Sequence, residues 1–227
     1  MAYILHIDTS GANSLVALAK DGALLSVINN DDARNHAAAL NLHIDSLLAQ
    51  NNITLQDIAA FCVCGGPGSY TGLRIGLATA KGFCYALDKP LMLHHRLLLI
   101  ANSNIEAYPL AEYFIVVLQA REGEYFSAVF NRQLLFVKEP QHLTEADFEE
   151  FVSNLPGRKL CVGYINEHIK NVMSSHDCSY VESSTINVAT WVKYAYAQYI
   201  CNEFVIPANS EPFYLKQVYT HNKKTIN

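Results

Sequence analysis

The sequence lacks an excess of positive charge. It has 16 lysines and arginines against 21 aspartates and glutamates, a net charge of −5 and a pI near 6.0. Proteins that bind nucleic acid by themselves use clusters of basic side chains to neutralise phosphates. If this protein acts on nucleic acid, we therefore expect another component to supply most of the phosphate contacts.

The six cysteines also lack a motif, because no two of them form a Cys-x-x-Cys pair. Cys62 and Cys64 lie two residues apart in a strand-like run and so share one face of the strand. Residues two apart along one strand rarely form a disulfide. The pattern predicts reduced thiols, as in a cytoplasmic protein.

Long hydrophobic runs are missing as well. The first ten residues, MAYILHIDTS, have no basic stretch, and their apolar run stops at Asp8, so no secretion signal is predicted. The longest apolar stretch, Ile75 to Ala86, is interrupted by Lys81, so no membrane helix is expected. With 51% hydrophobic residues in 227, the chain can form one large domain or two small ones. We expect a cytoplasmic globular protein.

The hydrophobic pattern predicts one order of elements twice. The first set has strands at 3–8, 15–20, 23–29, 59–64 and 90–94 and helices at 35–50 and 71–86. The second, weaker set has strands at 113–120, 125–131, 134–138 and 159–163 and helices at 144–153 and 187–203. Residues 174–184 are predicted as a loop, and the chain from residue 209 as an extended tail.

A βββαβα unit used twice is the plan of the actin-like (ASKHA, ribonuclease H-like) fold of sugar kinases and Hsp70 ATPases. The predicted class is therefore α/β with two lobes and a ligand cleft between them. We expect an N-terminal lobe at 1–97 and a C-terminal lobe at 98–227 with the extended tail. The two helices of the N-terminal lobe are the ones expected to bind a partner, for the reasons given below.

A glycine-rich loop, Gly65-Gly-Pro-Gly-Ser-Tyr-Thr-Gly-Leu-Arg74, joins a predicted strand to a helix. It does not match the Walker phosphate loop, the Gly-x-Gly-x-x-Gly dinucleotide pattern or the Gly-x-Ser-x-Gly nucleophile turn. An anion at the helix N-terminus remains an alternative that the residues allow.

The helix after this loop has a stripe of small residues. A glycine inside a helix costs about 1 kcal/mol relative to alanine, so a stripe of them indicates close approach by another backbone. The stripe either packs inside its own domain or faces a partner protein, and the wide apolar arc favours the partner. The preceding helix has a second apolar strip opposite its core face. The residues predicted at a partner contact are Ala38, Leu42, Ala49, Gly72, Leu73, Gly76, Leu77, Ala80 and Phe83.

Catalytic groups look incomplete. Actin-like ATPases place an acidic residue at the end of the first strand of each half, and the pair positions metal and phosphates. Asp8, followed by Thr9 and Ser10, has that position in the first half, but Gln119 occupies it in the second and cannot serve Mg²⁺ as a carboxylate does. Asp8, Thr9 and Ser10 either contact a nucleotide or brace their own turn.

The nine histidines do not predict a metal site. His36 and His43 are two helical turns apart, about 10 Å along the axis, which is too far for one ion. A zinc site needs three or four convergent ligands. His94 and His95 are interpreted as a polar end of a strand.

The run Tyr3-Ile-Leu-His-Ile-Asp-Thr-Ser10, together with Pro67-Gly-Ser-Tyr-Thr-Gly-Leu-Arg74, resembles the TsaB (YeaZ) family. The resemblance is strong over residues 1 to about 95 and returns at Glu211-Pro-Phe-Tyr-Leu215. It implies a non-catalytic subunit that pairs with the TsaD-type transferase to form N6-threonylcarbamoyladenosine next to the tRNA anticodon. It also implies a small TsaE-like ATPase as a further partner and tRNA contact only through the complex. We expect no cofactor bound by this chain itself, and whether ATP or ADP binds at the complex is left open by the sequence.

In that family the two N-lobe helices, here 35–50 and 71–86, form the partner contact. TsaD holds its metal with a His-x-x-x-His pair, and here His36 is followed by Leu40 instead of the second histidine. An Asp-Ala-Arg-x-Gly-Glu turn common in the family begins with Gln119 in this chain. Two alternatives stay open: a stand-alone ATP-using transferase or kinase of the actin-like fold, and a homodimer that uses the same helices.

Overall fold

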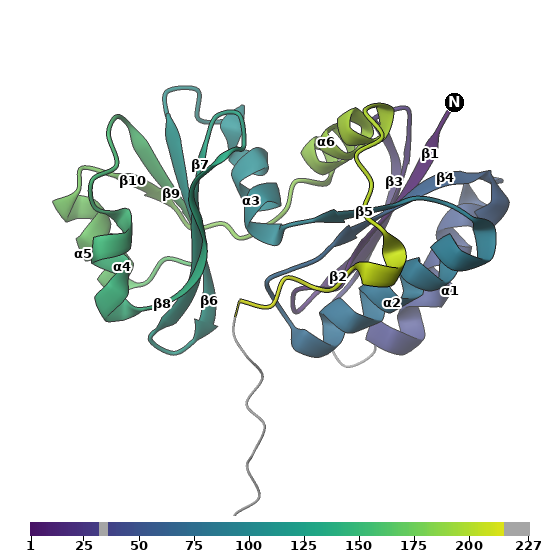
Figure 1. Cartoon of the computed structure of the whole chain (residues 1–227), viewed down its shortest axis with the longest axis horizontal. Coiled ribbons are helices and arrows are strands. Elements are labelled where there is room, and N and C mark those ends of the chain that lie inside the picture. Colours follow the sequence, from purple (N-terminus) through teal and green to yellow (C-terminus); the bar gives the residue numbers. More distant parts are fainter. Residues whose placement is uncertain (32–35, 216–227) are drawn as a thin grey trace, which may run out of the picture.

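The structure, a computed structural model, describes residues 1–31 and 36–215, with side chains in the first helix described from residue 39 onward. Two five-stranded sheets dominate it (Figure 1). The first has the order β3-β2-β1-β4-β5 and the second β10-β9-β6-β7-β8. The strands are β1 (Tyr3–Asp8), β2 (Ser14–Lys20), β3 (Ala23–Asn30), β4 (Ile58–Cys64), β5 (Leu91–His94), β6 (Tyr113–Arg121), β7 (Glu124–Asn131), β8 (Phe136–Thr144), β9 (Lys159–Gly163) and β10 (Ser179–Val181).

The helices follow the same repeated order. They are α1 (His36–Gln50), α2 (Tyr70–Leu87), α3 (Arg96–Ile105), α4 (Glu145–Val152), α5 (Glu167–Ser175) and α6 (Val188–Ile200), with short 3₁₀ turns η1 (Leu55–Asp57) and η2 (Pro207–Asn209). In each sheet the first three strands are antiparallel; the fourth pairs in parallel with the first, and the fifth pairs in parallel with the fourth. The predicted duplication of a βββαβα unit is confirmed.

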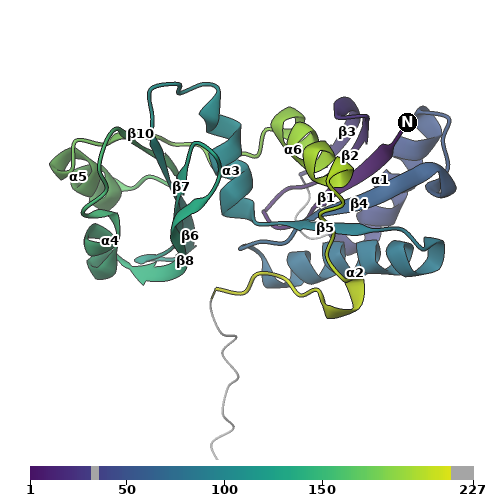
Figure 2. The same ribbon diagram turned by 45° about the horizontal axis from the view of Figure 1, so that its top comes forward.

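Five layers stack along the long axis. Helices α1 and α2 cover the outer face of the first sheet, and α4 and α5 cover the outer face of the second (Figures 1 and 2). Helices α3 and α6 lie between the sheets, where their apolar side chains join those of both sheets in one core cluster. We call the first sheet with α1 and α2 the first lobe, and the second sheet with α4 and α5 the second lobe.

Strands β1 and β4 are buried on both faces, which explains their nearly continuous apolar runs. Leu5 and Ile7 pack toward α1 and α2, whereas Ile4 packs into the cluster between the sheets. Cys62 and Cys64 both belong to that central cluster, as their spacing predicted. All six cysteines are free.

Local signals in the sequence correspond to the observed turns and caps. Asp21 and Gly22 turn β2 into β3 with φ of 48° and 81°. Thr54 and Thr144 each open a helical turn with a reciprocal capping box. These features depend on residues three or fewer apart, so the sequence predicts them directly. No helix among residues 1–31 and 36–215 is long and apolar enough to cross a membrane.

Two α-helices and one strand were not predicted, namely α3, α5 and β10, and neither was the 3₁₀ turn η2. The prediction of a loop at 174–184 is wrong, because β10 lies there and pairs in parallel with β9. Strand β10 has only 3 residues, too few for a periodic pattern to show. Strand β8 continues through Pro140, which an edge position tolerates.

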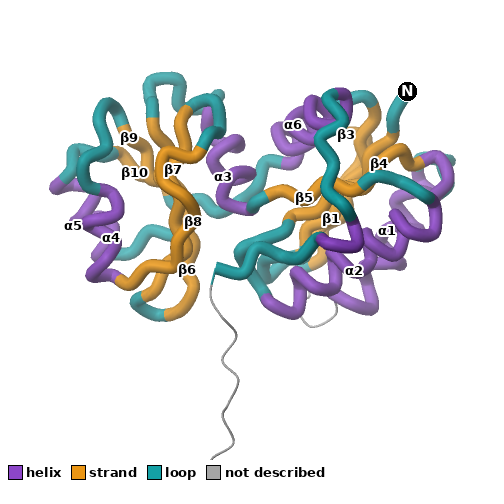
Figure 3. Tube along the Cα trace, viewed as in Figure 1, coloured by secondary structure: helices purple, strands orange, loops and turns teal. Residues whose placement is uncertain are grey.

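The chain returns to the first lobe after the second sheet. Helix α6 packs beside β3, and residues 205–215, which we call the strap, run across β5 and α2 (Figure 3). The backbone N–H of Val205 donates to Leu91 O at 2.9 Å, and that of Phe213 to Gly65 O at 2.9 Å. The boundary at residue 97 stays a prediction, but the stretch from 188 to 215, expected with the second lobe, lies largely on the first.

Candidate partner surface and interlobe cleft

The glycine-rich loop brings the start of α2 against the turn that follows β1. The Ser69 N–H donates to Ser10 O at 2.8 Å, and the Ser69 hydroxyl caps α2 by accepting from Gly72 N. A Cβ added to Gly68 would lie 2.1 Å from Ser10 O. The loop therefore serves backbone contact inside the chain.

The small-residue stripe on α2 continues this contact. A Cβ on Gly72 would lie 2.0 Å from the carbonyl oxygen of Thr9, and one on Gly76 would lie 2.3 Å from its hydroxyl. The Thr9 hydroxyl donates to Gly72 O at 2.7 Å. The glycines admit the turn after β1, and the prediction that they face a partner is wrong.

The rest of the arc on α2 is also covered by the chain itself. Leu73, Leu77 and Ala80 are 2%, 4% and 0% exposed. Phe83 is half-buried and stacks on Phe61, with ring centroids 5.4 Å apart. Leu73, Leu77 and Ala80 are core positions, so their predicted partner contact is wrong, whereas a contact at the half-buried Phe83 stays a prediction. A helical pattern shows which residues share a face but not what covers that face.

The strip on α1 is different. Leu42 is 65% exposed and Ala49 is exposed, although both were assigned from the same kind of pattern. The side chain of Ala38 lies outside the described residues. Both positions lie on the exposed side of α1, opposite its buried residues Leu40, Ile44, Leu47 and Leu48, and helix α1 itself contacts α2. A partner contact at Leu42 and Ala49 stays a prediction that the exposure permits.

Helix α2 presents its own small residues outward. Ala78, Gly82 and Ala86 are exposed and four residues apart, and Tyr85 beside them is 93% exposed. A Cβ at Gly82 would meet nothing within 4 Å. We call Leu42 and Ala49 of α1 and Ala78, Gly82, Tyr85 and Ala86 of α2 the outer helix face. The α2 residues of this face are not among the contact residues predicted from the sequence.

The strap occupies one flank of α2. Lys81 Nζ donates to the carbonyl of Ser210 at 3.1 Å, and Arg74 Nε donates to the Tyr214 hydroxyl at 2.9 Å. The Arg74 guanidinium also lies 4.1 Å from the ring centroid of Tyr70. The outer helix face is therefore bounded on this side by the chain itself.

Asp8, Thr9 and Ser10 are buried at 8%, 0% and 1% exposure. One carboxylate oxygen of Asp8 accepts the Ser10 N–H at 2.8 Å and the Ser10 hydroxyl at 2.6 Å. This is the bracing arrangement that the sequence left open beside nucleotide contact. Nucleotide contact by these residues stays a prediction.

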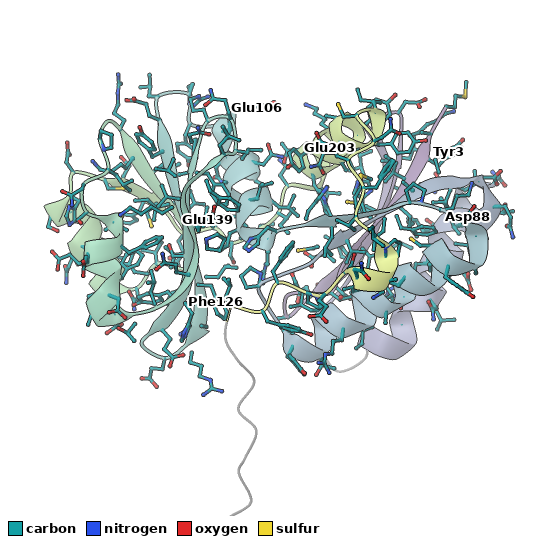
Figure 4. The ribbon with its side chains drawn as sticks, viewed as in Figure 1. Tyr3, Asp88, Glu106, Phe126, Glu139 and Glu203 are labelled. Atoms are coloured by element: carbon teal, nitrogen blue, oxygen red, sulfur yellow. The ribbon has the colours of Figure 1, made fainter. Side chains whose placement is uncertain are left out.

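Asp8 is the last residue of β1 and Gln119 lies near the end of β6, and the correspondence of the two positions stays a prediction. The Gln119 amide donates to the Tyr164 hydroxyl at 3.3 Å. Between the lobes lie two adjoining pockets of about 440 and 250 Å³, which we call the interlobe cleft. Both are lined by Gly68, Arg96, Gln119 and Phe126, and Figure 4 shows Phe126 where the lobes face each other. No pattern in the sequence singled out Arg96.

His94 and His95 do more than form a polar end of strand β5. His94 is 5% exposed; its Nδ1 accepts the Trp191 indole N–H at 2.8 Å, and its Nε2 contacts Gln198. Burial lowers the pKa of His94 to about 4. His95 Nδ1 accepts from Leu97 N and so caps α3. His94 therefore anchors α6 to the first sheet.

His6 lies in the same central layer, edge-on to Trp191, and is fully buried. Burial, followed by the proximity of His94, lowers its pKa to about 3. Burial also raises the thiol pKa of Cys62 and Cys64. Among the residues whose side chains are described, no group of three or more histidines, cysteines or acids could hold a metal ion.

The repeated sheet order and the cleft between the lobes define a protein of the actin-like class. Residues 23–189 match the family model of TsaD, tRNA N6-adenosine threonylcarbamoyltransferase. The chain is 31% identical over 149 residues to the tRNA threonylcarbamoyladenosine biosynthesis protein TsaB of Haemophilus influenzae, covering 65% of this chain and 58% of that protein. It is 28% identical over 164 residues to TsaB of Bacillus subtilis, covering 71% and 70%.

Among solved structures, YeaZ from Pseudomonas aeruginosa superimposes with a TM-score of 0.76 at 20% identity, over 95% of this chain and 100% of that one. At this identity the likeness shows a common fold. The chain belongs to the TsaD family and, within it, to the TsaB (YeaZ) group. The predicted family and fold class are confirmed. The chain spans 58% of the length of the Haemophilus relative, less than two thirds.

Proposed function

We propose that the protein is a non-catalytic accessory subunit that pairs with a TsaD-type transferase to form N6-threonylcarbamoyladenosine next to the tRNA anticodon. The names of its relatives, which are tRNA threonylcarbamoyladenosine biosynthesis proteins, supply the pathway. The main observation in favour of a non-catalytic role concerns Asp8 and Gln119, near the ends of the first strands of the two sheets. Asp8 is engaged by its own turn, and Gln119 has no charge to hold a metal.

The outer helix face supports the pairing part of the proposal. It combines small residues, which let another helix approach closely, with two large exposed apolar side chains, Leu42 and Tyr85. Tyrosines near the centre of an interface contribute strongly to binding. The face takes the TsaD-like subunit in the working complex and a second copy of this chain when the protein is alone. A TsaE-like ATPase, ATP or ADP and the tRNA join at the level of the complex, in the cytoplasm.

The test is size-exclusion chromatography with light scattering, on the protein alone and mixed with the TsaD-like chain of its own genome. Ala78→Arg and Gly82→Arg add a long charged side chain to the outer helix face without a clash in the monomer. Ala197→Arg is the matched control, since Ala197 is an exposed helical alanine on α6, across the sheet from α2. We expect the first two variants to weaken the one-to-one complex at least about tenfold and the control to bind normally.

The proposed role in tRNA modification is tested by measuring the modified nucleoside in tRNA after reaction with the TsaD-like chain and its other components. Omitting this protein should abolish the product, and the two outer-face variants should reduce it in parallel with binding. If all three arginine variants bind alike, the outer helix face is not the contact. An ATPase activity of the isolated protein that disappears in Asp8→Ala would overturn its non-catalytic role.

A further inference from the structure

Two tyrosines hold Arg74 in one orientation, although this arginine lies on the surface of α2. Its Nε donates to the Tyr214 hydroxyl of the strap at 2.9 Å, and its guanidinium lies 4.1 Å from the ring centroid of Tyr70. The two tyrosine rings also contact each other, with centroids 5.3 Å apart, and each tyrosine is 38% exposed. Ordering a free arginine side chain costs rotamer entropy when a partner binds. Here Tyr70 and Tyr214 restrict that freedom before any partner is present.

The outward part of this guanidinium lacks an acceptor. Among the described residues, neither Nη group of Arg74 donates a hydrogen bond, and no carboxylate forms an ion pair with it. The pKa of the guanidinium is raised, most by its hydrogen bond to Tyr214 and least by the charge of Glu211 on the strap. Glu211 is therefore near Arg74 but not bonded to it. Charged N–H donors thus lie exposed at the surface beside the strap.

Arg74 adjoins the outer helix face. Because the four residues are spaced four apart, Arg74, Ala78, Gly82 and Ala86 form one ridge along α2, and all are exposed. Gly82 is eight residues beyond Arg74, about 12 Å along the helix axis. A partner helix that packs closely on Ala78 and Gly82 would therefore lie beside the guanidinium.

Pairing at this face would take Arg74 partly out of water. Its Nη groups would lose their hydrogen bonds to water, which is costly for a charged group unless the partner offers an acceptor. A hydroxyl or a backbone carbonyl would leave the charge unmatched. A carboxylate matches the charge and also accepts two parallel hydrogen bonds from the planar guanidinium.

We propose that Arg74, positioned by Tyr70 and Tyr214, binds a carboxylate on a helix of the TsaD-type partner, and that this ion pair selects the partner for the outer helix face. The inference rests on the proposed function, because it requires that this face takes the TsaD-like subunit. It adds the chemistry of the contact: an aspartate or glutamate of the partner faces Arg74, and the strap takes part in recognition through Tyr214.

The first experiment measures the affinity of the full chain for the TsaD-like chain of its own genome by isothermal titration calorimetry. Arg74→Gln should weaken the complex about tenfold or more, and Arg74→Lys should recover only part of the loss, because lysine lacks the planar pair of donors. Tyr214→Phe removes only the hydroxyl that holds Nε and should weaken binding less, with no further effect when Arg74→Gln is already present. The matched control, Arg158→Gln, removes an exposed arginine of the second lobe and should bind normally.

Double-mutant cycles then identify the carboxylate. Each exposed aspartate or glutamate on the helices of the TsaD-like chain is changed to asparagine or glutamine and is measured against the wild-type chain and Arg74→Gln. We expect one acid whose loss weakens the wild-type complex about tenfold and leaves the Arg74→Gln complex unchanged. A second copy of this chain would instead offer Asp45, which is exposed on α1 between Leu42 and Ala49. Self-association of Asp45→Asn is therefore measured beside that of Arg74→Gln.

Four results would contradict the proposal. If the complex forms and Arg74→Gln binds as tightly as Arg158→Gln, Arg74 is not an anchor, while the proposed function stands. If Arg74→Gln loses affinity but no acid of the partner is coupled to it, Arg74 serves only to hold the strap, and both Arg74→Gln and Tyr214→Phe should then lower the melting temperature. If only self-association depends on Arg74 and Asp45, the carboxylate belongs to a second copy. If no complex forms with the wild-type chain, the proposed function fails and this inference fails with it.

Discussion

Two glycines of α2 should respond in opposite ways to the same substitution. Gly72 faces the turn after β1, where an added Cβ would lie 2.0 Å from Thr9 O and 3.2 Å from Ser69 Oγ. Gly82 faces outward, where an added Cβ would meet nothing within 4 Å. Gly72→Ala should therefore destabilise the protein and Gly82→Ala should stabilise it.

The magnitudes follow from these contacts. Ordinary contact requires more than 3 Å, so Gly72→Ala must move the helix start and the turn apart by over 1 Å. That movement strains two hydrogen bonds, Ser69 N to Ser10 O and Thr9 Oγ1 to Gly72 O. Their loss at about 1 kcal/mol each, with an overpacking cost of about 1–3 kcal/mol, outweighs a helix-propensity gain of about 1 kcal/mol. We expect a net loss of about 2–4 kcal/mol.

Gly82→Ala has only the propensity term and should gain about 0.5–1 kcal/mol. Urea unfolding followed by far-ultraviolet circular dichroism measures both changes on one scale. If Gly72→Ala proved neutral or stabilising, the helix would not lie against the turn as described. If Gly82→Ala were strongly destabilising, Gly82 would be a buried position and could not belong to an exposed outer helix face.

Three further outcomes follow from the buried groups. In the native protein only the thiol of Cys201 should react rapidly with Ellman's reagent, against six after unfolding, because the other five are buried; a second fast thiol would contradict the packing. His6 and His94 have pKa values of about 3 and 4 against an ordinary 6.5, so the unfolded chain binds protons first and stability falls as the pH drops below about 6.5. Urea unfolding at pH 7.5 and pH 5 should show a loss of about 2 kcal/mol per histidine, reduced in His6→Leu, and a pH-independent midpoint would refute this. Trp191→Phe leaves His94 Nδ1 without its indole donor and should cost about 1–3 kcal/mol in the same assay, whereas Tyr85→Phe, at a side chain 93% exposed, should cost almost nothing.

Much of the fold can be predicted from the local pattern of apolar and polar residues in the sequence. Strands β1, β2, β4 and β9 and helices α1 and α2 were predicted within about two residues of the bounds observed. Their apolar runs, the turn at Asp21 and Gly22 and the capping boxes all arise from interactions between near neighbours. The family resemblance was legible as well, because it rests on a contiguous run around the glycine-rich loop.

The candidate site was less accessible. The positions of Asp8 at the end of β1 and Gln119 near the end of β6 could be predicted from the strand patterns. The place of Arg96 in the interlobe cleft could not, because it depends on Gln119 and Phe126, which come from the other lobe. The return of α6 through Trp191 to His94 spans 97 residues, and no local pattern records such a contact.

The sequence by itself determined that this protein has two βββαβα lobes, belongs to the TsaB group, and carries two apolar strips on its first helices. Only the tertiary structure decided which face of these helices is covered by the rest of the chain and which is exposed. Periodicity specifies the residues that share a helix face, whereas coverage depends on chain segments far away in sequence. The turn after β1 fills the face with Gly72 and Gly76, and the opposite face with Gly82 remains open for a partner.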